Sequence, residues 1–245
     1  RNPPKLFIDE GALRMSLNHS PSIVTDGLTL CIDAANSRSY PGTGTTWTDL
    51  KGGQNGVLTN MDDSNFNTDN GGCLSFDGAD EYAEFPSFTA TAEATVTCRW
   101  RLPAGATSSN TTSHRMWRGH NNYEIRMSTY AASAGNGSGN GCWIGDVGGT
   151  RIWTERRNWD ANVWYSLTLT NSLVDDFYKL YLDGVLVTSI AMGSYNPAGL
   201  GTEMLVGGRG VQSMVGDIAS FFIYNRALTA DEVRQNYEAT VGRYT

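Results

Sequence analysis

Residues 203–238 constrain the fold of this chain more than any other stretch, because they predict strands, a tight turn and a helix in close succession. Residues 204–206 form a short apolar run that stops at a Gly-Gly pair. Residues 217–224 follow Gly216 and form a second run, rich in β-branched and aromatic side chains. Both runs predict strands, and we expect the upstream chain to pack against this C-terminal unit.

The helix after these strands has a specified start. Thr229 and Glu232 have the spacing of a capping box, in which each side chain accepts a hydrogen bond from a backbone N–H that the helix leaves unpaired. Leu228 and Val233 are placed to form the accompanying hydrophobic staple, and Tyr237 continues the apolar face four residues after Val233. We expect a short helix that acts as a lid on the edge of a sheet.

Residues 178–190 predict the clearest hairpin, because Asp183-Gly184 suits a two-residue type I′ turn. That turn implies four cross-strand pairs: Leu182 with Val185, Leu180 with Val187, Tyr181 with Leu186, and Lys179 with Thr188. The first two pairs should face the core. Residues 28–32 also alternate apolar and other side chains, as a sheet strand does.

Composition favours one all-β domain behind an N-terminal arm. The 245 residues are 40% hydrophobic, and 28 glycines with few helical patterns fit short strands joined by many turns. Residues 1–25 have no helical or strand period long enough to fold alone, so we divide the chain into an arm or leader, residues 1–25, and a domain, residues 26–245. A flexible tail is the alternative interpretation of the arm.

Charge and cysteine spacing exclude other classes. The net charge of −7 disfavours a nucleic-acid partner, and no apolar run approaches the roughly 20 residues that membrane insertion by a helix needs. Four cysteines lie far apart without metal-ligand spacing: Cys31, Cys73, Cys98 and Cys142. We expect them to be reduced and structural, although their even number leaves a disulfide open.

Several motifs together resemble a known family. They include Asp-Ala-Ala-Asn at residues 33–36, Leu-Ser-Phe-Asp-Gly-x-Asp-x-Tyr at residues 74–82, Leu-Tyr-Leu-Asp-Gly-Val-Leu-Val at residues 180–187, and Ile-Tyr-Asn-Arg-Ala-Leu-Thr-Ala-Asp-Glu-Val at residues 223–233. This series resembles the laminin-G-like, or concanavalin A-like, lectin/glucanase domains. The order of the motifs near the N-terminus resembles the versions of that domain in virion structural proteins of tailed bacteriophages.

The resemblance implies an antiparallel jelly-roll β-sandwich with one short C-terminal helix, preceded by the extended arm. It also implies a non-enzymatic virion protein, either a capsid decoration or cement protein or a component of the tail or fibre. Such a protein would dock through its arm and a sandwich edge onto major capsid or tail proteins, in virions assembled in the host cytoplasm. Whether it forms a homo-oligomer stays open.

A carbohydrate-binding module that recognises host surface glycans is the alternative function. Sugar binding uses exposed aromatic rings with polar neighbours, and the candidate residues cluster around a glycine-rich stretch: Tyr130, Trp143, Trp153 and Trp159. In an all-β protein such side chains more often belong to the core.

Catalysis and metal binding have less support. A glycanase needs two carboxylates facing each other across a sugar, and the nearest cluster, Asp80, Glu81 and Glu84, lacks the family's spacing. We therefore expect no enzymatic activity. Calcium is a possible cofactor, because several relatives hold Ca²⁺ at one rim, and Asp77 and Asp217 each adjoin a glycine at a strand end. Turn-capping carboxylates are the alternative interpretation of these two residues.

Overall fold

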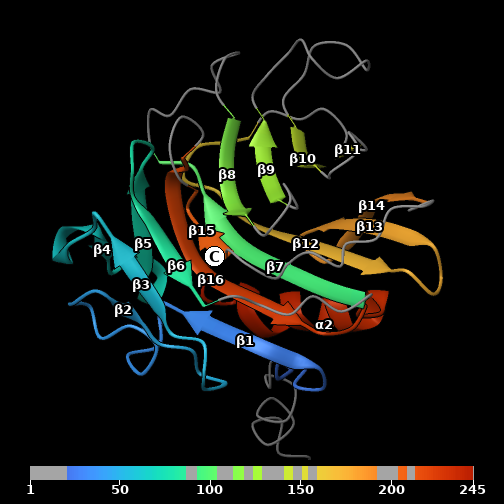
Figure 1. Cartoon of the computed structure of the whole chain (residues 1–245), viewed down its shortest axis with the longest axis horizontal. Helices are drawn as coiled ribbons and strands as arrows, with labels where there is room; N and C mark the ends of the chain where they lie inside the picture. The colour runs from blue at the N-terminus through green and yellow to red at the C-terminus, as the bar shows by residue number, and fades with distance from the viewer. Residues whose placement is uncertain are drawn as a thin grey trace, which may run out of the picture.

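A computed structural model describes residues 21–86, 93–103, 113–118, 124–128, 141–145, 151–153, 159–191, 204–208 and 213–244. In these residues the chain forms two antiparallel sheets, each of eight strands, and one α-helix near the C-terminus (Figure 1). Two short 3-10 turns, η1 (Asp63–Asn65) and η2 (Asp69–Gly71), interrupt the strands. The predicted antiparallel β-sandwich with a C-terminal helix is confirmed.

The first sheet, sheet A, is centred on three long neighbouring strands, β12 (Trp164–Ser172), β7 (Glu93–Arg101) and β16 (Val215–Tyr224). Its order is β14 (Val185–Ile190), β13 (Phe177–Leu182), β12, β7, β16, β5 (Cys73–Asp77) and β4 (Phe66–Asn67), with β1 (Leu28–Asp33) also paired to β16. Within the described residues, the first and last strands, β1 and β16, are therefore hydrogen-bonded neighbours.

The second sheet, sheet B, is built mostly from shorter strands. Its order is β11 (Arg151–Trp153), β10 (Gly141–Gly145), β9 (Glu124–Ser128), β8 (Ser113–Arg118), β15 (Met204–Val206), β6 (Tyr82–Phe85), β3 (Gly56–Thr59) and β2 (Thr46–Trp47). The two runs predicted within residues 203–238 are confirmed as strands, and they lie in different sheets, β15 in sheet B and β16 in sheet A.

The main core lies between the sheets, because alternate residues of each strand point inward. On β7, Val96, Cys98 and Trp100 are fully buried in this core. The ring of Trp117 on β8 lies 6.1 Å from the ring of Phe221 on β16, which joins the two sheets.

The hairpin of β13 and β14 has the predicted turn but a different register. Asp183 and Gly184 have positive φ angles of 50° and 78°, as a type I′ turn requires. Leu182 pairs with Val185 and Tyr181 with Leu186 as predicted, but Leu180 pairs with Thr188 and Lys179 with Ser189. The predicted pairs Leu180–Val187 and Lys179–Thr188 are wrong, because a bulge at Val187 inserts one extra residue into β14.

The helix α2 (Ala230–Val241) covers the outer face of sheet A rather than its edge. Phe222 and Tyr224 point away from the main core and form a second apolar cluster with Leu228 and Val233. A bare outer face with these aromatic side chains would be exposed to water, so the helix completes the burial of β16. No helix in the described part of the chain is long and apolar enough to cross a membrane.

Candidate functional site: an anchored N-terminal segment

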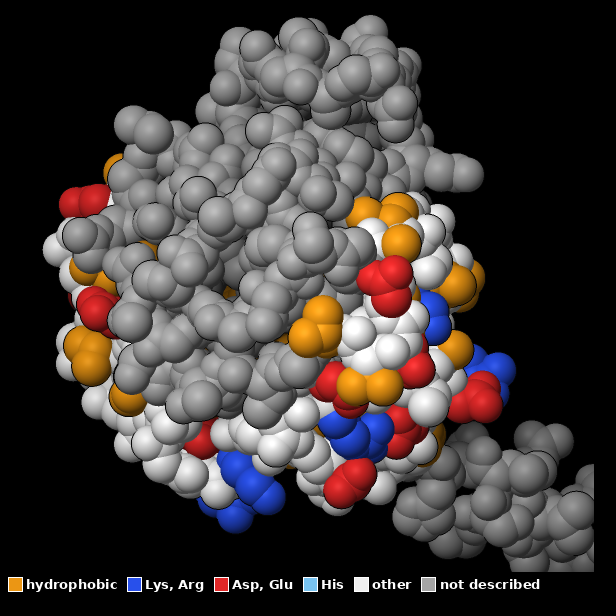
Figure 2. All heavy atoms as spheres, turned by 45° about the vertical axis from the view of Figure 1, so that its right-hand side comes forward, with side chains coloured by type: hydrophobic (Ala, Val, Ile, Leu, Met, Phe, Trp, Pro, Cys, Tyr) orange, Lys and Arg blue, Asp and Glu red, His pale blue; other side chains and the backbone are white. Residues whose placement is uncertain are grey.

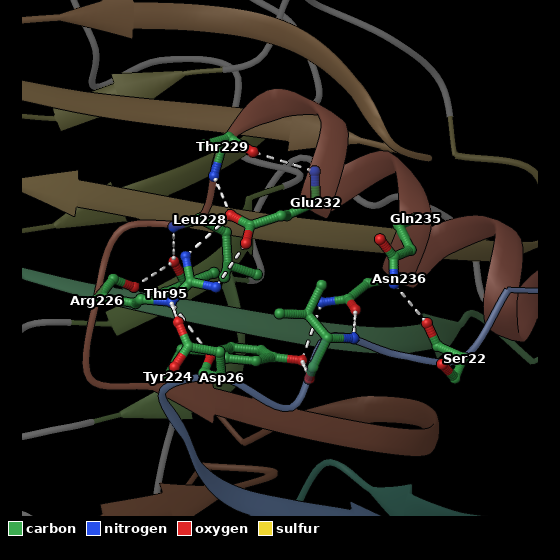
Figure 3. A network of polar contacts seen from close by, with 11 residues as sticks. Ser22, Asp26, Thr95, Tyr224, Arg226, Leu228, Thr229, Glu232, Gln235 and Asn236 are labelled. Carbon is green, nitrogen blue, oxygen red and sulfur yellow. Dashed lines mark hydrogen bonds and ion pairs between the residues drawn. The ribbon is translucent and has the colours of Figure 1, made fainter.

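Residues 22–26 lie against α2 and the end of β16, and buried side chains hold their backbone (Figure 3). The N–H of Val24 donates to Oδ1 of Asn236 over 2.8 Å, and the hydroxyl of Tyr224 donates to the carbonyl of Val24 over 3.0 Å. The amide of Asn236 in turn donates to Oη of Tyr224 over 3.0 Å. Asn236 and Tyr224 are buried, so these polar groups satisfy one another away from water.

Two further contacts flank this central one. Nε2 of Gln235 donates to the carbonyl of Ser22 over 2.7 Å, and Nε of Arg226 lies 2.9 Å from Oδ2 of Asp26. The side chain of Val24 is buried in the apolar cluster under α2. We call residues 22–26 the anchor segment, and we call the side chains that hold it the anchor surface: Tyr224, Arg226, Gln235 and Asn236. Residues 22–25, which the sequence analysis placed in the arm, are therefore attached to the domain.

The start of α2 stabilises the anchor surface. The predicted capping box is present, because Oγ1 of Thr229 accepts the N–H of Glu232 and Oε2 of Glu232 accepts the N–H of Thr229. The guanidinium of Arg226 also binds the Glu232 carboxylate, with Nη1 at 2.9 Å, and holds the pKa of Glu232 at about 2. Arg226 therefore links the helix start to Asp26 of the anchor segment.

A buried arginine lies farther along the same outer face. The guanidinium of Arg99 lies 5.2 Å from the ring centroid of Tyr237 and 4.6 Å from that of Tyr244, so two aromatic rings contact it. Its Nη1 is 3.9 Å from Oδ1 of Asp183, and burial lowers the pKa of Arg99. The C-terminal residues of the domain thus shield a charge that β7 places on its outer face.

The predicted calcium ligand Asp217 belongs to a buried ion pair. Oδ2 of Asp217 lies 2.5 Å from Nε of Arg101, and Oδ1 accepts the hydroxyl of Ser75 over 2.6 Å. The other predicted ligand, Asp77, is exposed, and its Oδ1 accepts the N–H of Ala79 in a local turn. A cation at Asp217 would meet the positive charge of Arg101 and displace both existing partners.

These two carboxylates do not fit a calcium site. No group of three or more His, Cys, Asp or Glu side chains in the described ranges could hold a metal ion. A hard cation needs several oxygen ligands around one centre, whereas Asp77 and Asp217 serve separate structural roles.

Trp159 is a core residue. It is 5% exposed, and its ring centroid lies 5.1 Å from that of Trp100 and 4.9 Å from that of Tyr165. A ring packed in this way has no free face for a sugar, so the predicted platform role of Trp159 is not supported.

The other aromatic candidates lie where less of the structure is described. Trp143 on β10 pairs with Trp153 on β11 in the backbone register, so these two positions are neighbours in sheet B. Tyr130 lies outside the described residues. On the described surface, the exposed large apolar side chains are Val57, Val163, Val174, Val185 and Leu186, none of them aromatic. On the face shown in Figure 2, the hydrophobic side chains of the described residues are scattered among acidic and basic ones.

The acidic residues weighed as glycanase candidates form local contacts. Glu81 accepts hydrogen bonds from the N–H of Asp77 and from the amide of Asn65, and Asp80 accepts one from the amide of Asn60. Glu84 is exposed on β6. These bonds organise turns at the strand ends, and the prediction that the protein is not an enzyme stays a prediction.

The cysteines whose side chains are described are free thiols, as predicted: Cys31, Cys73 and Cys98. Burial raises the pKa of Cys31 and of Cys73 to about 12, so neither forms a reactive thiolate near neutral pH. Cys142 is on β10, and its side chain lies outside the described part of the structure.

Sequence reasoning missed the anchor surface. Asn236 follows Val233 by three residues and so shares the buried side of α2, and a polar residue on that side was the available signal. The buried arginines Arg99 and Arg101 were not predicted either, because they alternate with the core residues Cys98 and Trp100 as solvent-facing residues do.

Comparison with known proteins assigns this fold to a family. Residues 77–234, well over half of the 245, match the family described as the concanavalin A-like lectin/glucanases superfamily. The chain therefore belongs to that superfamily, as its motifs predicted. No curated protein matches the sequence.

Solved structures share the fold at low sequence identity. A Trypanosoma rangeli sialidase bound to the inhibitor DANA is 15% identical, with a TM-score of 0.61 over 98% of this chain and 40% of the sialidase chain. The receptor-binding domain of botulinum neurotoxin D is 14% identical, with a TM-score of 0.64 over 88% of this chain and 53% of the toxin chain. The chain thus spans about half or less of each of these structures, and at such identity they show the fold alone.

Proposed function

We propose that this protein is a non-enzymatic structural component of a tailed-phage virion, either a capsid decoration protein or part of the tail or fibre. It would attach to major capsid or tail proteins through the N-terminal arm and a sandwich edge. The observation that carries this proposal is the anchor segment, whose backbone is fixed to α2 and to the end of β16 by the buried side chains of Asn236 and Tyr224. The resemblance of residues 33–82 to domains of phage virion proteins supports the same assignment.

The position of the anchor segment suits an attachment role. Figure 1 shows β1 and α2 on the lower side of the view and β8–β11 on the upper side. A particle bound on the α2 side would leave sheet B facing outward. Fixing the segment on a rigid sandwich also reduces the entropy that an arm loses when it docks.

Deletion of residues 1–20 tests this attachment. The cut leaves the anchor segment in place, so the domain should keep its melting temperature and circular dichroism spectrum. The shortened protein should no longer bind particles that lack the native protein, whereas the full-length chain should bind them. A shortened protein that attaches as well as the full-length chain would contradict the role of the arm.

Glycan recognition is a second candidate function, and it is compatible with the first. The fold is shared with a sialidase and with a toxin's receptor-binding domain, and β10 and β11 bring Trp143 and Trp153 together. A glycan array should detect saturable binding that Trp143→Ala and Trp153→Ala each weaken. Binding unchanged by both substitutions would rule out this aromatic pair.

A separate assay tests the non-enzymatic assignment. Hydrolysis of a glycan by the purified protein, lost in Glu81→Gln or Glu84→Gln, would contradict that assignment.

A further inference from the structure

We propose that the anchor surface also binds the anchor segment of a second copy of this chain, so that neighbouring copies exchange residues 22–26. This inference deepens the proposed function and rests on it, because it names the partner that the attachment side of the domain accepts. The exchanged contacts would be the same as those seen within one chain.

The anchor segment is held in the way that a bound peptide is held. The strand ladder of β1 begins at Leu28, so residues 22–26 are outside the sheet. Side chains of the anchor surface bind both backbone polar groups of Val24 and the carbonyl of Ser22. Contacts between side chains and a peptide backbone do not require that the peptide belong to the same chain.

Two side chains of the segment add selectivity. Val24 is 8% exposed and enters the apolar cluster of Tyr181, Phe222 and Leu228. Asp26, two residues later, pairs with Arg226. The surface therefore suits a short peptide with a β-branched residue followed two positions later by an acidic one. Residues 22–26 of another copy meet this requirement.

A turn joins the segment to β1 and provides the hinge that exchange needs. The N–H of Leu28 donates to the carbonyl of Thr25 over 3.2 Å, and Gly27 between them has a φ of 75°. Rotation within this turn would redirect the segment outward while the ladder between β1 and β16 stays intact. Exchange of an identical element between copies keeps the contacts of residues 22–26 with the anchor surface, so its extent depends on local concentration.

A disulfide between the segment and the surface tests the exchange in the full-length chain. Ser22→Cys combined with Gln235→Cys introduces thiols at two positions in contact, where Nε2 of Gln235 and the carbonyl of Ser22 are 2.7 Å apart. Chains labelled with ¹⁴N and ¹⁵N are mixed in equal amounts, incubated over a range of concentrations, and oxidised. Mass spectrometry of the peptides joined through positions 22 and 235 then separates links within one chain from links between two chains. Ser22→Cys with Arg234→Cys is the matched control, because Arg234 is an exposed neighbour on the same helix.

The proposal predicts that mixed-isotope links form and that their share rises at least severalfold over a hundredfold increase in concentration. Links confined to single chains at every concentration would overturn it, and so would the absence of any link between positions 22 and 235. In chains without new cysteines, light scattering should show dimers at the same concentrations and fewer dimers for Asn236→Ala. Monomers alone would overturn the proposal. If the exchange between copies fails these tests but the protein still attaches to particles, the proposed function remains supported. Failure of the exchange is therefore distinguishable from failure of the proposed function.

Discussion

Asn236 illustrates how one polar side chain can tie together segments far apart in the sequence. Its Oδ1 and Nδ2 atoms both form hydrogen bonds in a buried site, one to Val24 and one to Tyr224. Removing the amide leaves the N–H of Val24 without that acceptor. Because an unsatisfied buried polar group costs about 1–3 kcal/mol, the anchor should depend strongly on this residue.

We predict that Asn236→Ala lowers the free energy of unfolding by about 2 kcal/mol, from the lost bonds and the unpaired backbone group. Urea unfolding followed by circular dichroism measures this change. Gln235→Ala is the control, because Gln235 makes a more exposed bond to the same segment and should cost less than about 1 kcal/mol. Equal effects of the two substitutions would contradict the central role of Asn236.

A second prediction for a single residue concerns the buried ion pair of Asp217. Asp217→Asn should destabilise the domain by about 3–5 kcal/mol, because Arg101 would lose the buried partner of its charge. Asp69→Asn is the control, since Asp69 pairs with the same arginine through a side chain that is 60% exposed, and exposed pairs contribute about 0–1 kcal/mol. Both variants can be compared by urea unfolding. A loss below about 1 kcal/mol for Asp217→Asn, the size expected of an exposed pair, would show that the ion pair does not hold this end of sheet A.

Single residues were the hardest features to predict from the sequence. The sequence indicated Asp217 as a candidate calcium ligand and Trp159 as a candidate sugar-binding ring, but a carboxylate beside a glycine is equally suited to an ion pair or a metal site. Only the neighbours across the sheet decide between them, and here Arg101 and Ser75 come from other strands. Trp159 was ambiguous in the same way, because its burial depends on Trp100 and Tyr165.

At the scale of elements, the helix α2 combines a predicted start with an unpredicted position. The capping box and the staple were readable because they depend on residues close in sequence, from Leu228 to Val233. The face that α2 covers depends on outward side chains of two strands, β13 and β16, and β13 is distant from the helix in sequence. The bulge at Val187 was missed for a related reason, since the turn sets only the first pairs of a hairpin.

The Arg226–Glu232 pair predicts a specific pH dependence of stability. The pKa of Glu232 falls from its usual 4.5 to about 2 in the folded protein, mainly because Arg226 binds the carboxylate. A lowered folded-state pKa contributes stability above pH 4.5 and loses it as the pH falls toward 2. The free energy of unfolding should therefore decrease over this range by more in the native chain than in Glu232→Gln.

Urea unfolding at several pH values spanning the two pKa values of Glu232, about 2 and 4.5, measures this difference. Glu238→Gln is the matched control, because Glu238 is an exposed glutamate of the same helix whose ion pair with Arg234 is longer, at 3.7 Å. If Glu232→Gln and the native chain lose stability in parallel as the pH falls, the Arg226–Glu232 pair does not stabilise the helix start.

At the scale of the whole molecule, the protein is a lectin-like sandwich with its anchored N-terminal segment and its helix on one side. The sandwich was predictable because its strands alternate regularly and its motifs resemble those of one superfamily. The anchor surface was not, because it joins residues 22–26 to residues 224–236 and involves only a few side chains. In our account, the side that carries α2 attaches the protein to a particle and sheet B faces outward.

The copy number of the protein in purified, intact particles tests this account most directly. Quantitative mass spectrometry with isotope-labelled peptides would measure it against the major capsid protein. We predict a fixed ratio, either near one copy per capsid subunit or a simple lattice fraction for a decoration protein, or a few copies per particle for a tail or fibre component. Washed particles that contain no copies would contradict the claim that this protein is a structural part of the virion.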